Sequence, residues 1–322
     1  MPSIRDARLR HASYYNHILH TSGQMFQRGG AGVSRGLQLF DENEENIRSA
    51  WEWVALRVSY DVQSAELCSS FPSAGAHLFF LRQHPRERIQ WLDAALGAAQ
   101  HLKKRELEGK HMGNLGVAYW ALGDFPRAIH YCEQDLSIAR ELGDTVGESS
   151  ALNNLGNVYY SSGDFRRAIE LYEQQLTITR EVADRQGEGV ALNNLGNSYA
   201  DLGETERAIE FYEKSLVIKR EVGDLQGEGN TVGNLGIAYG ELGDYVRALE
   251  LYERQLTITR GVGDRRGEGN ALFNASQALY KLDRRDEAIV YAEATLEIRT
   301  EIEDLNVSKV RAALAEWRRP QQ

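Results

Sequence analysis

The tripeptide Asn154-Leu155-Gly156 has three further copies in the chain, at residues 114–116, 194–196 and 234–236. A divergent copy, Asn274-Ala275-Ser276, follows 40 residues after the last of them, and no insertion disturbs the spacing. Self-similarity at a fixed period of about 20–50 residues is typical of solenoids built from stacked structural units. The 40-residue period therefore predicts an array of like units.

Four other columns keep the same period: Tyr119, Tyr159, Tyr199 and Tyr239; Ala128, Ala168, Ala208, Ala248 and Ala288; Leu136, Leu176, Leu216, Leu256 and Leu296; and Asp144, Asp184, Asp224, Asp264 and Asp304. In one unit Leu152, Leu155 and Tyr159 lie three and four residues apart, which is typical of the buried stripe of a helix. Gly163 suits a left-handed helix end, and a second helix is predicted over residues 164–184. Each unit is thus a predicted helix pair, and the predicted fold class is all-α.

A glycine lies inside the first helix of each unit, at Gly116, Gly156, Gly196 and Gly236. Glycine in a helix costs about 0.5–1 kcal/mol relative to alanine, so its retention implies a steric need. We expect each glycine to face an alanine of the second helix, which lets the two helices approach closely, with the tyrosine filling the space beside them.

The order Leu, Gly, Tyr on the first helix and Ala, Tyr, Leu on the second resembles the tetratricopeptide repeat, which is usually about 34 residues long. The extra length lies in a longer second helix and in a joint that reads Gly223-Asp224-Leu225-Gln226-Gly227-Glu228-Gly229. Repeats of this form are similar to those of Pins-type adaptors and, more loosely, of kinesin light chains. The resemblance covers residues 109–307 and implies a right-handed superhelical solenoid of tetratricopeptide helix pairs.

Four segments are predicted along the chain. Residues 1–67 form an N-terminal helical cap or attachment region, 68–107 a degenerate repeat, 108–307 five 40-residue repeats and 308–322 a C-terminal capping helix. The N-terminal third is similar to the repeat-bearing region of bacterial STAND-type signalling NTPases, but the phosphate-binding motif Gly-x-x-x-x-Gly-Lys-Ser/Thr is missing. The glycine-rich segment 29–36 is expected to be a flexible loop between two helices.

Composition argues against several classes of partner. Residues 1–105 hold 13 Lys and Arg against 10 Asp and Glu, whereas residues 106–322 hold 24 against 37. This acidic majority disfavours nucleic acid, and no apolar run is long enough to span a membrane. Cys68 and Cys132 are isolated thiols, which fits a reducing cytoplasm and predicts two small buried hydrophobic residues.

Motifs for catalysis are missing as well, since the chain has no Gly-x-Ser-x-Gly, His-Glu-x-x-His or Cys-x-x-Cys. His11, His17 and His20 cluster near the N-terminus, but no acidic or cysteine side chain joins them at ligand spacing. Surface histidines are therefore favoured over a metal site. We predict that the protein is not an enzyme and uses no metal or cofactor.

By resemblance, the first helices line a concave groove and the asparagine of each Asn-Leu-Gly points into it. An asparagine amide offers an acceptor and two donors, so it can hold both the C=O and the N–H of an extended peptide. Arginines on the second helix could in addition grip acidic side chains. The predicted peptide-binding residues are Asn114, Asn154, Asn194, Asn234 and Asn274; their neighbours Asn153, Asn157, Asn193 and Asn197; and Arg140, Arg180, Arg220 and Arg260.

Alternatives stay open for these residues and for the function. Each asparagine amide could instead tie its helix to the next repeat, and each arginine could pair with the aspartate four residues later. The predicted function is a protein-interaction scaffold that binds a protein or peptide segment in the groove. The alternative is the ligand-sensing region of a STAND-type signalling NTPase or transcription regulator, and self-association into a homo-oligomer is also left open.

Overall fold

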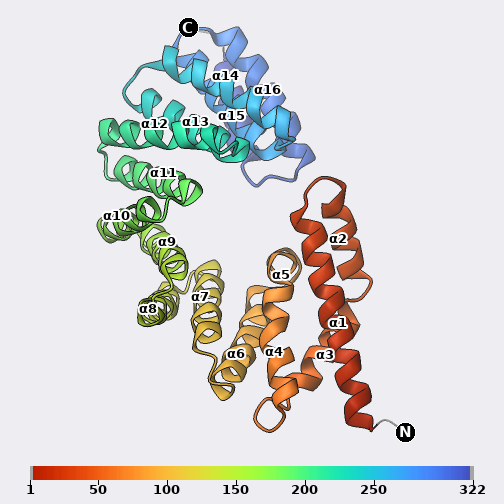
Figure 1. The fold of residues 1–322 in the computed structure, drawn as a ribbon. Helices are drawn as coiled ribbons and strands as arrows, with labels where there is room; N and C mark the ends of the chain where they lie inside the picture. The colour runs from red at the N-terminus through yellow and green to blue at the C-terminus, as the bar shows by residue number, and fades with distance from the viewer. Residues whose placement is uncertain (1–2, 320–322) are drawn as a thin grey trace. The chain divides into compact units, whose positions relative to one another are not determined.

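The computed structural model describes residues 3–319, and the predicted all-α class is confirmed. The described residues form 17 α-helices and no β-strand, with successive helices running antiparallel in pairs (Figure 1). Residues 1–2 and 320–322 of the predicted end segments lie outside the described residues. The chain divides into two compact units, of which the first ends at Ser162 and the second begins at Gly163.

The first unit holds nine helices in its described part: α1 (Ile4–Gln27), α2 (Ala31–Asp41), α3 (Glu44–Ala55), α4 (Val62–Ala74), α5 (Ala76–Arg82), α6 (Pro85–His101), α7 (Arg105–Ala121), α8 (Phe125–Leu142) and α9 (Thr145–Ser161). Helix α1 packs against α2, α3 and α4, and from α6 onward each helix packs against the next. The N-terminal third of the chain is therefore helical and joined directly to the first regular repeat.

The second unit holds eight helices in its described part: α10 (Phe165–Glu181), α11 (Arg185–Asp201), α12 (Thr205–Glu221), α13 (Leu225–Glu241), α14 (Tyr245–Val262), α15 (Arg265–Lys281), α16 (Arg285–Glu301) and α17 (Val307–Trp317). Each helix packs against the next in order along the chain. We call α7, α9, α11, α13 and α15 the A helices and α8, α10, α12, α14 and α16 the B helices.

The joint between a B helix and the next A helix follows from the repeated Gly-Asp-x-x-Gly-Glu sequence. Gly223 has a φ of +71°, a left-handed conformation that glycine adopts without steric cost. Asp184 is the N-cap residue of α11, and its carboxylate accepts a hydrogen bond from the amide of Gly187 at 2.9 Å. A Cβ on Gly187 would overlap that carboxylate, which explains the glycine at this position.

The expected contact between the A-helix glycines and the alanine column is seen at Gly116, whose Cβ position lies 3.2 Å from the carbonyl oxygen of Ala128, whereas in the second unit a tyrosine of the B helix is nearest. The nearest neighbour of Gly196 is the ring of Tyr212, and that of Gly236 is the ring of Tyr252. In both cases a Cβ would lie 2.5 Å from a ring carbon. The glycine therefore makes room for a large aromatic side chain on the B helix.

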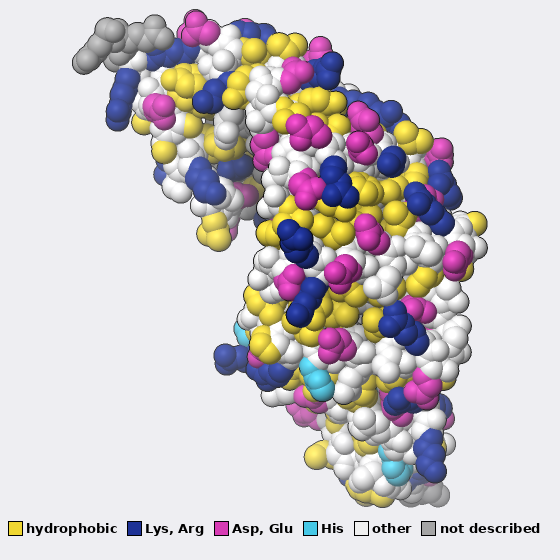
Figure 2. All heavy atoms as spheres, turned by 90° about the vertical axis from the view of Figure 1, so that its left-hand side faces the viewer, with side chains coloured by type: hydrophobic (Ala, Val, Ile, Leu, Met, Phe, Trp, Pro, Cys, Tyr) yellow, Lys and Arg dark blue, Asp and Glu magenta, His cyan; other side chains and the backbone are white. Residues whose placement is uncertain are grey.

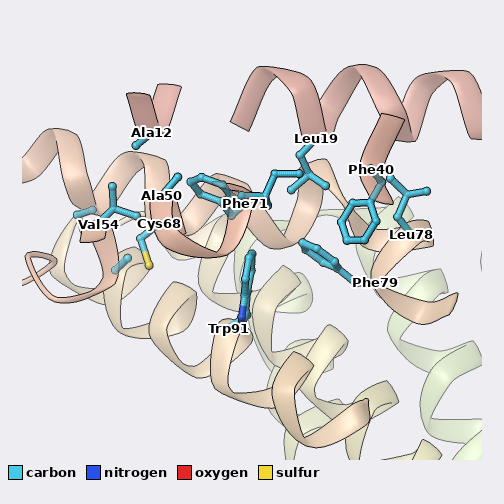
Figure 3. Close-up of a cluster of buried hydrophobic side chains, with 13 residues drawn as sticks. Ala12, Leu19, Phe40, Ala50, Val54, Cys68, Phe71, Leu78, Phe79 and Trp91 are labelled. Atoms are coloured by element: carbon cyan, nitrogen blue, oxygen red, sulfur yellow. The ribbon is translucent and has the colours of Figure 1, made fainter. Parts of the chain in front are cut away.

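An aromatic cluster forms the core of the first unit (Figure 3). Trp91 of α6 stacks on Trp51 of α3, with ring centroids 4.4 Å apart and planes 4° apart. Phe79 of α5 meets the other side of the cluster, with its ring centroid 4.9 Å from that of Trp91. Leu19 of α1 and Phe71 of α4 are fully buried beside them, so four helices are fixed to α6 through one core.

The expectation of a flexible loop at residues 29–36 is wrong. The turn is confined to Gly29 and Gly30, which have positive φ, and the rest of the segment belongs to α2. A Cβ on Gly36 would lie 2.5 Å from the carbonyl oxygen of Ser22, so this glycine sits where α1 and α2 cross closely. Gly36 therefore allows a tight contact between two helices. A glycine-rich sequence is found both in such contacts and in loops, so the sequence alone does not distinguish the two.

The helix pair before the regular repeats is irregular. Helix α6 begins at Pro85, which is 40 residues before Phe125 of α8, so it keeps the register of the B helices. The stretch before α6 is divided at Gly75 into α4 and α5, whereas α7, the A helix of the next repeat, is one continuous helix. Pro72 lies inside α4 and has no N–H for the helical hydrogen bond, which weakens the helix just before this break.

Helix α17 covers the last repeat. Its Val310, Leu314 and Trp317 are buried, and the Trp317 ring stacks on Tyr280 of α15 at 4.8 Å. The outer apolar face of the last pair is thus covered, as a repeat array requires. Within residues 3–319 we find no helix that combines the length and the apolar character needed to cross a membrane.

Candidate functional site

The five asparagines of the repeated tripeptide occupy the same position on the five A helices. We call Asn114, Asn154, Asn194, Asn234 and Asn274 the asparagine column. Asn114 is exposed and the other four are partly buried. Partial burial leaves an amide accessible to a ligand while its side chain is held in place by its neighbours.

A cavity of about 550 Å³ opens beside the column in the first unit. It lies between α7, α8 and α9, and Asn114 and Asn154 both line it. Gly113 on α7 and Asp135 on α8 also line it and lie in direct contact with each other. Two asparagines of the column therefore border one hollow on the surface, which is how side chains that hold a bound peptide would be placed.

A second cavity of the first unit, about 400 Å³, also has Asn114 in its lining. Its other walls are mainly apolar and include Phe80, which is 63% exposed, and the core residue Trp91. The guanidinium of Arg88 lies over the Phe80 ring at 5.3 Å, and its Nε and Nη2 are buried without a hydrogen-bond partner in the described structure. Asn114 thus lies between an apolar cavity and the more polar cavity beside Asp135.

In the second unit, a cavity of about 410 Å³ lies between α13, α14 and α15. Its lining includes Asn274 of the column, the exposed Ile237 and the ring of Tyr252. Cavities therefore accompany the asparagine column in each unit.

Asparagine amides of the second unit also bind one another. Asn234 Nδ2 donates to Asn197 Oδ1 at 3.0 Å, and the same oxygen accepts from the hydroxyl of Tyr212 at 2.8 Å. Asn193 Oδ1 accepts from Thr231 at 3.1 Å. These bonds tie α11 to α12 and α13. They agree with the alternative interpretation, in which the asparagine amides tie a helix to the next repeat. They use the NH₂ group of Asn234 and the carbonyl oxygens of Asn193 and Asn197, which is half of what each amide offers.

The arginine column lies at the joints, and each member binds the glutamate eight residues later. The Nε–Oε1 distances are 2.7 Å for Arg140–Glu148, 2.8 Å for Arg180–Glu188, 3.1 Å for Arg220–Glu228 and 2.8 Å for Arg260–Glu268. The aspartate four residues after each arginine, which was the alternative partner, instead caps the next A helix. Figure 2 shows positive and negative side chains interspersed on one face of the molecule.

Glu188 binds two arginines and should therefore contribute measurably to stability. Its carboxylate is 9% exposed and accepts hydrogen bonds from Arg180 and Arg185. Burial alone would raise the pKa of Glu188, but these bonds outweigh it and the pKa is lowered. We expect Glu188→Gln to lower the free energy of unfolding by about 1–2 kcal/mol at pH 7. Urea denaturation measures the change.

The pH dependence supplies a check on this assignment. A lowered carboxyl pKa stabilises the fold above the unfolded value of about 4.3, and the stabilisation is lost as the pH falls through the folded value. The difference between wild type and Glu188→Gln should therefore shrink below about pH 4. Glu221→Gln, at a carboxylate that is 52% exposed and bound to the same Arg185, should change stability by less than about 0.5 kcal/mol. Equal losses in the two variants would contradict the assignment.

Asp135 is a residue of the site that the sequence patterns did not single out. Burial, and to a lesser degree the charge of Asp144, raise the pKa of Asp135 to about 7. The equivalent residues of the other repeats are Gln175, Ser215, Gln255 and Thr295, which are all neutral. Asp135 could therefore have been found from the sequence, as the one carboxylate in a column of otherwise uncharged residues.

The ionised form of Asp135 should destabilise the fold. A raised carboxyl pKa means that the folded chain binds more protons than the unfolded chain between about pH 4 and pH 7, so stability falls as the pH rises through this range. We expect Asp135→Asn to raise the free energy of unfolding by about 1–3 kcal/mol at pH 8 and to change it little at pH 4. Urea denaturation at both pH values measures this, and a gain that is equal at both would show that the charge is not the cause.

Other predicted features concern cysteines and metals. Cys68 and Cys132 are free and fully buried, as expected for small hydrophobic residues, and burial raises the pKa of each thiol to about 12. In the part of the chain that the structure describes, no group of three His, Cys, Asp or Glu side chains is placed to hold a metal ion.

Antiparallel helix pairs that recur every 40 residues define a helical-repeat protein. The sequence profile of the tetratricopeptide repeat matches residues 106–181, 147–221 and 227–301, and the chain therefore belongs to the tetratricopeptide-repeat family. No curated protein sequence matches the chain at a significant level.

Solved structures with the same fold include three that bear on the predictions. The first is a STAND protein with a tetratricopeptide repeat sensor from Pyrococcus horikoshii. The alignment covers 95% of this chain and 53% of the STAND chain, at 17% identity and a TM-score of 0.53. Kinesin light chain-type repeats from Podosopora anserina match 61% of this chain and 96% of their own, at 19% identity and a TM-score of 0.52. For a Rap protein complexed with competence and sporulation factor, the alignment covers 95% of this chain and 100% of the Rap chain, at 12% identity and a TM-score of 0.58. At these identities the likeness concerns the fold.

Proposed function

We propose that this protein is a non-enzymatic interaction scaffold whose A helices bind an extended segment of a protein or peptide. The observation that carries the proposal is the asparagine column, whose members Asn114, Asn154 and Asn274 border open cavities. An amide in such a place can bind the backbone of a segment of any sequence, while the cavities accept its side chains.

The expected affinity depends on several amides acting together. A hydrogen bond from one amide contributes about 0.5–1.5 kcal/mol net, so a useful affinity needs a series of them. In the second unit Asn234 already donates to Asn197, and a peptide would use the remaining acceptor of Asn234. The four arginines are left out of the proposed site, because their guanidinium groups already bind carboxylates at the joints.

A second candidate is the ligand-sensing region of a signalling NTPase. The match of 95% of this chain to part of a STAND protein with a tetratricopeptide repeat sensor favours it. In that case the same A-helix face would bind the ligand, and an ATPase or effector domain would respond to it. Sequencing the gene upstream of the codon for Met1 separates the two candidates, since such a domain in the same reading frame would favour the sensor.

Replacing asparagines of the column tests the proposal. We expect the triple variant with Asn154, Asn194 and Asn234 changed to alanine to capture peptides from a phage-displayed random library about tenfold less well, or worse, than wild type. The double variant Asn114→Ala with Asn154→Ala leaves the amide contacts of the second unit intact and should also lose capture.

The control replaces Asn46, an exposed asparagine of α3 that lies outside the A helices, and should capture peptides as wild type does. Circular dichroism monitors folding of every variant. Unchanged capture by both column variants, with the helical signal preserved, would refute the role of the column.

A further inference from the structure

The cavity between α7, α8 and α9 has walls that suit a long side chain with an apolar stem. Ile138 and Leu142 of α8 and Val146 of α9 line it together with Asn114 and Asn154. Its volume of about 550 Å³ leaves room for one large side chain and part of a peptide backbone. An occupant held by the two asparagines would thus direct a side chain along an apolar wall.

The carboxylate of Asp135 is the distinctive polar group of this cavity. Comparable carboxylates of the repeats have cationic partners, as Glu188 and Glu268 do with two arginines each. Among residues 3–319, the interactions that act on Asp135 are burial and the like charge of Asp144, with no hydrogen bond or cation among them. A partly buried carboxylate without a counter-ion is unfavourable, and a cation supplied by a ligand would relieve this.

The carboxylate of Asp135 packs against Gly113 of α7. A Cβ at Gly113 would overlap the Oδ2 atom of Asp135, so glycine at this position makes room for the carboxylate between α7 and α8. Gly109, one turn earlier on α7, lies against the other carboxylate oxygen, with a distance of 3.2 Å from its Cβ position to Oδ1. Two glycines one turn apart thus make room for Asp135 at the contact between α7 and α8, where it is partly buried and lines the cavity.

From this arrangement we propose that the cavity is a subsite for a basic side chain, lysine or arginine, of the bound segment, with Asp135 as its counter-ion. The inference rests on the proposed function, since the segment is the one that Asn114 and Asn154 would hold. The alkyl stem of the basic residue packs on the apolar wall while its charged head reaches Asp135, in the way that lysine and arginine commonly bury their stems.

The surrounding charges agree with a cationic ligand. Glu106 and Asp144 also line the cavity, and its one basic lining residue, Lys110, pairs with Glu106 at 2.6 Å. The cavity therefore has a negative net charge before a ligand binds. Since the other repeats carry neutral residues at the position of Asp135, this subsite would fix the register of a bound segment along the repeats.

Peptide selection with matched variants tests the proposal. Wild type, Asp135→Asn and Glu133→Gln are each used to select peptides from the same phage-displayed random library at pH 8. Glu133 is an exposed residue of the same helix outside the cavity, so its variant removes an equal charge elsewhere. We expect wild type and Glu133→Gln to enrich lysine and arginine at one peptide position about five- to tenfold over the input, and Asp135→Asn to lose this enrichment.

Each outcome has a defined meaning. Peptides captured by wild type without basic enrichment, or with enrichment that Asp135→Asn retains, would overturn the subsite while leaving the scaffold proposal intact. Failure of wild type to capture any peptide would overturn the scaffold proposal and this inference with it. Circular dichroism of Asp135→Asn establishes that the variant is folded, which we expect because the substitution removes an unpaired charge.

Affinity as a function of pH provides a second measurement. A cation binds the ionised form of Asp135, whose pKa is raised to about 7 in the free protein. The other charged groups that line the same cavity are Glu106 and Lys110 on α7 and Asp144 before α9, of which Asp144 acts on Asp135 through its charge. For one selected basic peptide, binding should strengthen between pH 6 and pH 8 by about tenfold in wild type and stay constant in Asp135→Asn. A pH dependence that is the same in both would contradict the assignment.

Discussion

Replacement of Trp91 by alanine is expected to lower the free energy of unfolding by about 3–5 kcal/mol, the range for removal of a large aromatic side chain from a core. Trp91 is 2% exposed and contacts Trp51, Phe71 and Phe79, which come from three other helices. The loss should be this large because the cavity left behind is bordered by helices that cannot all move inward.

Urea denaturation followed by far-ultraviolet circular dichroism measures the effect of Trp91→Ala. Tyr60→Ala is the control, because Tyr60 is an aromatic residue of the same unit that is 70% exposed, and its loss should change stability by less than about 0.5 kcal/mol. If Trp91→Ala cost no more than the control, the N-terminal helices would not be joined through this core.

Alanine at Gly236 is expected to destabilise the protein by about 1–3 kcal/mol, although alanine is the better helix former. The new Cβ would lie 2.5 Å from the ring of Tyr252, which is 5% exposed and has no room to turn away. Gly240, one turn later on the same helix, is the matched control. Its Cβ would meet atoms no closer than 3.8 Å, so Gly240→Ala should stabilise by about 0.5–1 kcal/mol.

A double-mutant cycle with Tyr252→Leu identifies the cause of the effect at Gly236. If the clash with the ring destabilises Gly236→Ala, the cost of the alanine should be smaller in the Tyr252→Leu background than in wild type. Urea denaturation of the four proteins gives the coupling energy. Additive losses, or a stabilised Gly236→Ala, would show that the glycine does not serve this contact.

The fold could be predicted from the sequence because its signals are local and repeated. The 40-residue period and the helical spacing of Leu152, Leu155 and Tyr159 reflect contacts within one unit, which every copy repeats. The capping role of Asp184 is local too, since its partner Gly187 is three residues away. Such features need no knowledge of how distant helices pack.

The remaining features depend on packing between elements. Arg180 binds Glu188 because the chain turns between them at the joint, so the helical spacing that favoured Asp184 does not apply. The partner of Gly236 is set by how α13 and α14 interdigitate, which the sequence leaves open between alanine and tyrosine. Asp135 could have been noticed as the one carboxylate of its column, but the missing counter-ion that makes it important depends on how the helices pack around it.

The central claim is that the A-helix face binds the partner, and site-specific photo-crosslinking tests it most directly. Benzoylphenylalanine is placed at Ile237, which is 45% exposed on the A helix α13, or at Val217, which is 52% exposed on the B helix α12. Each folded variant is irradiated with a peptide selected by the wild-type protein. We predict a covalent adduct from position 237 and none from position 217. An adduct that forms equally at both positions, or at 217 alone, would contradict binding by the A helices.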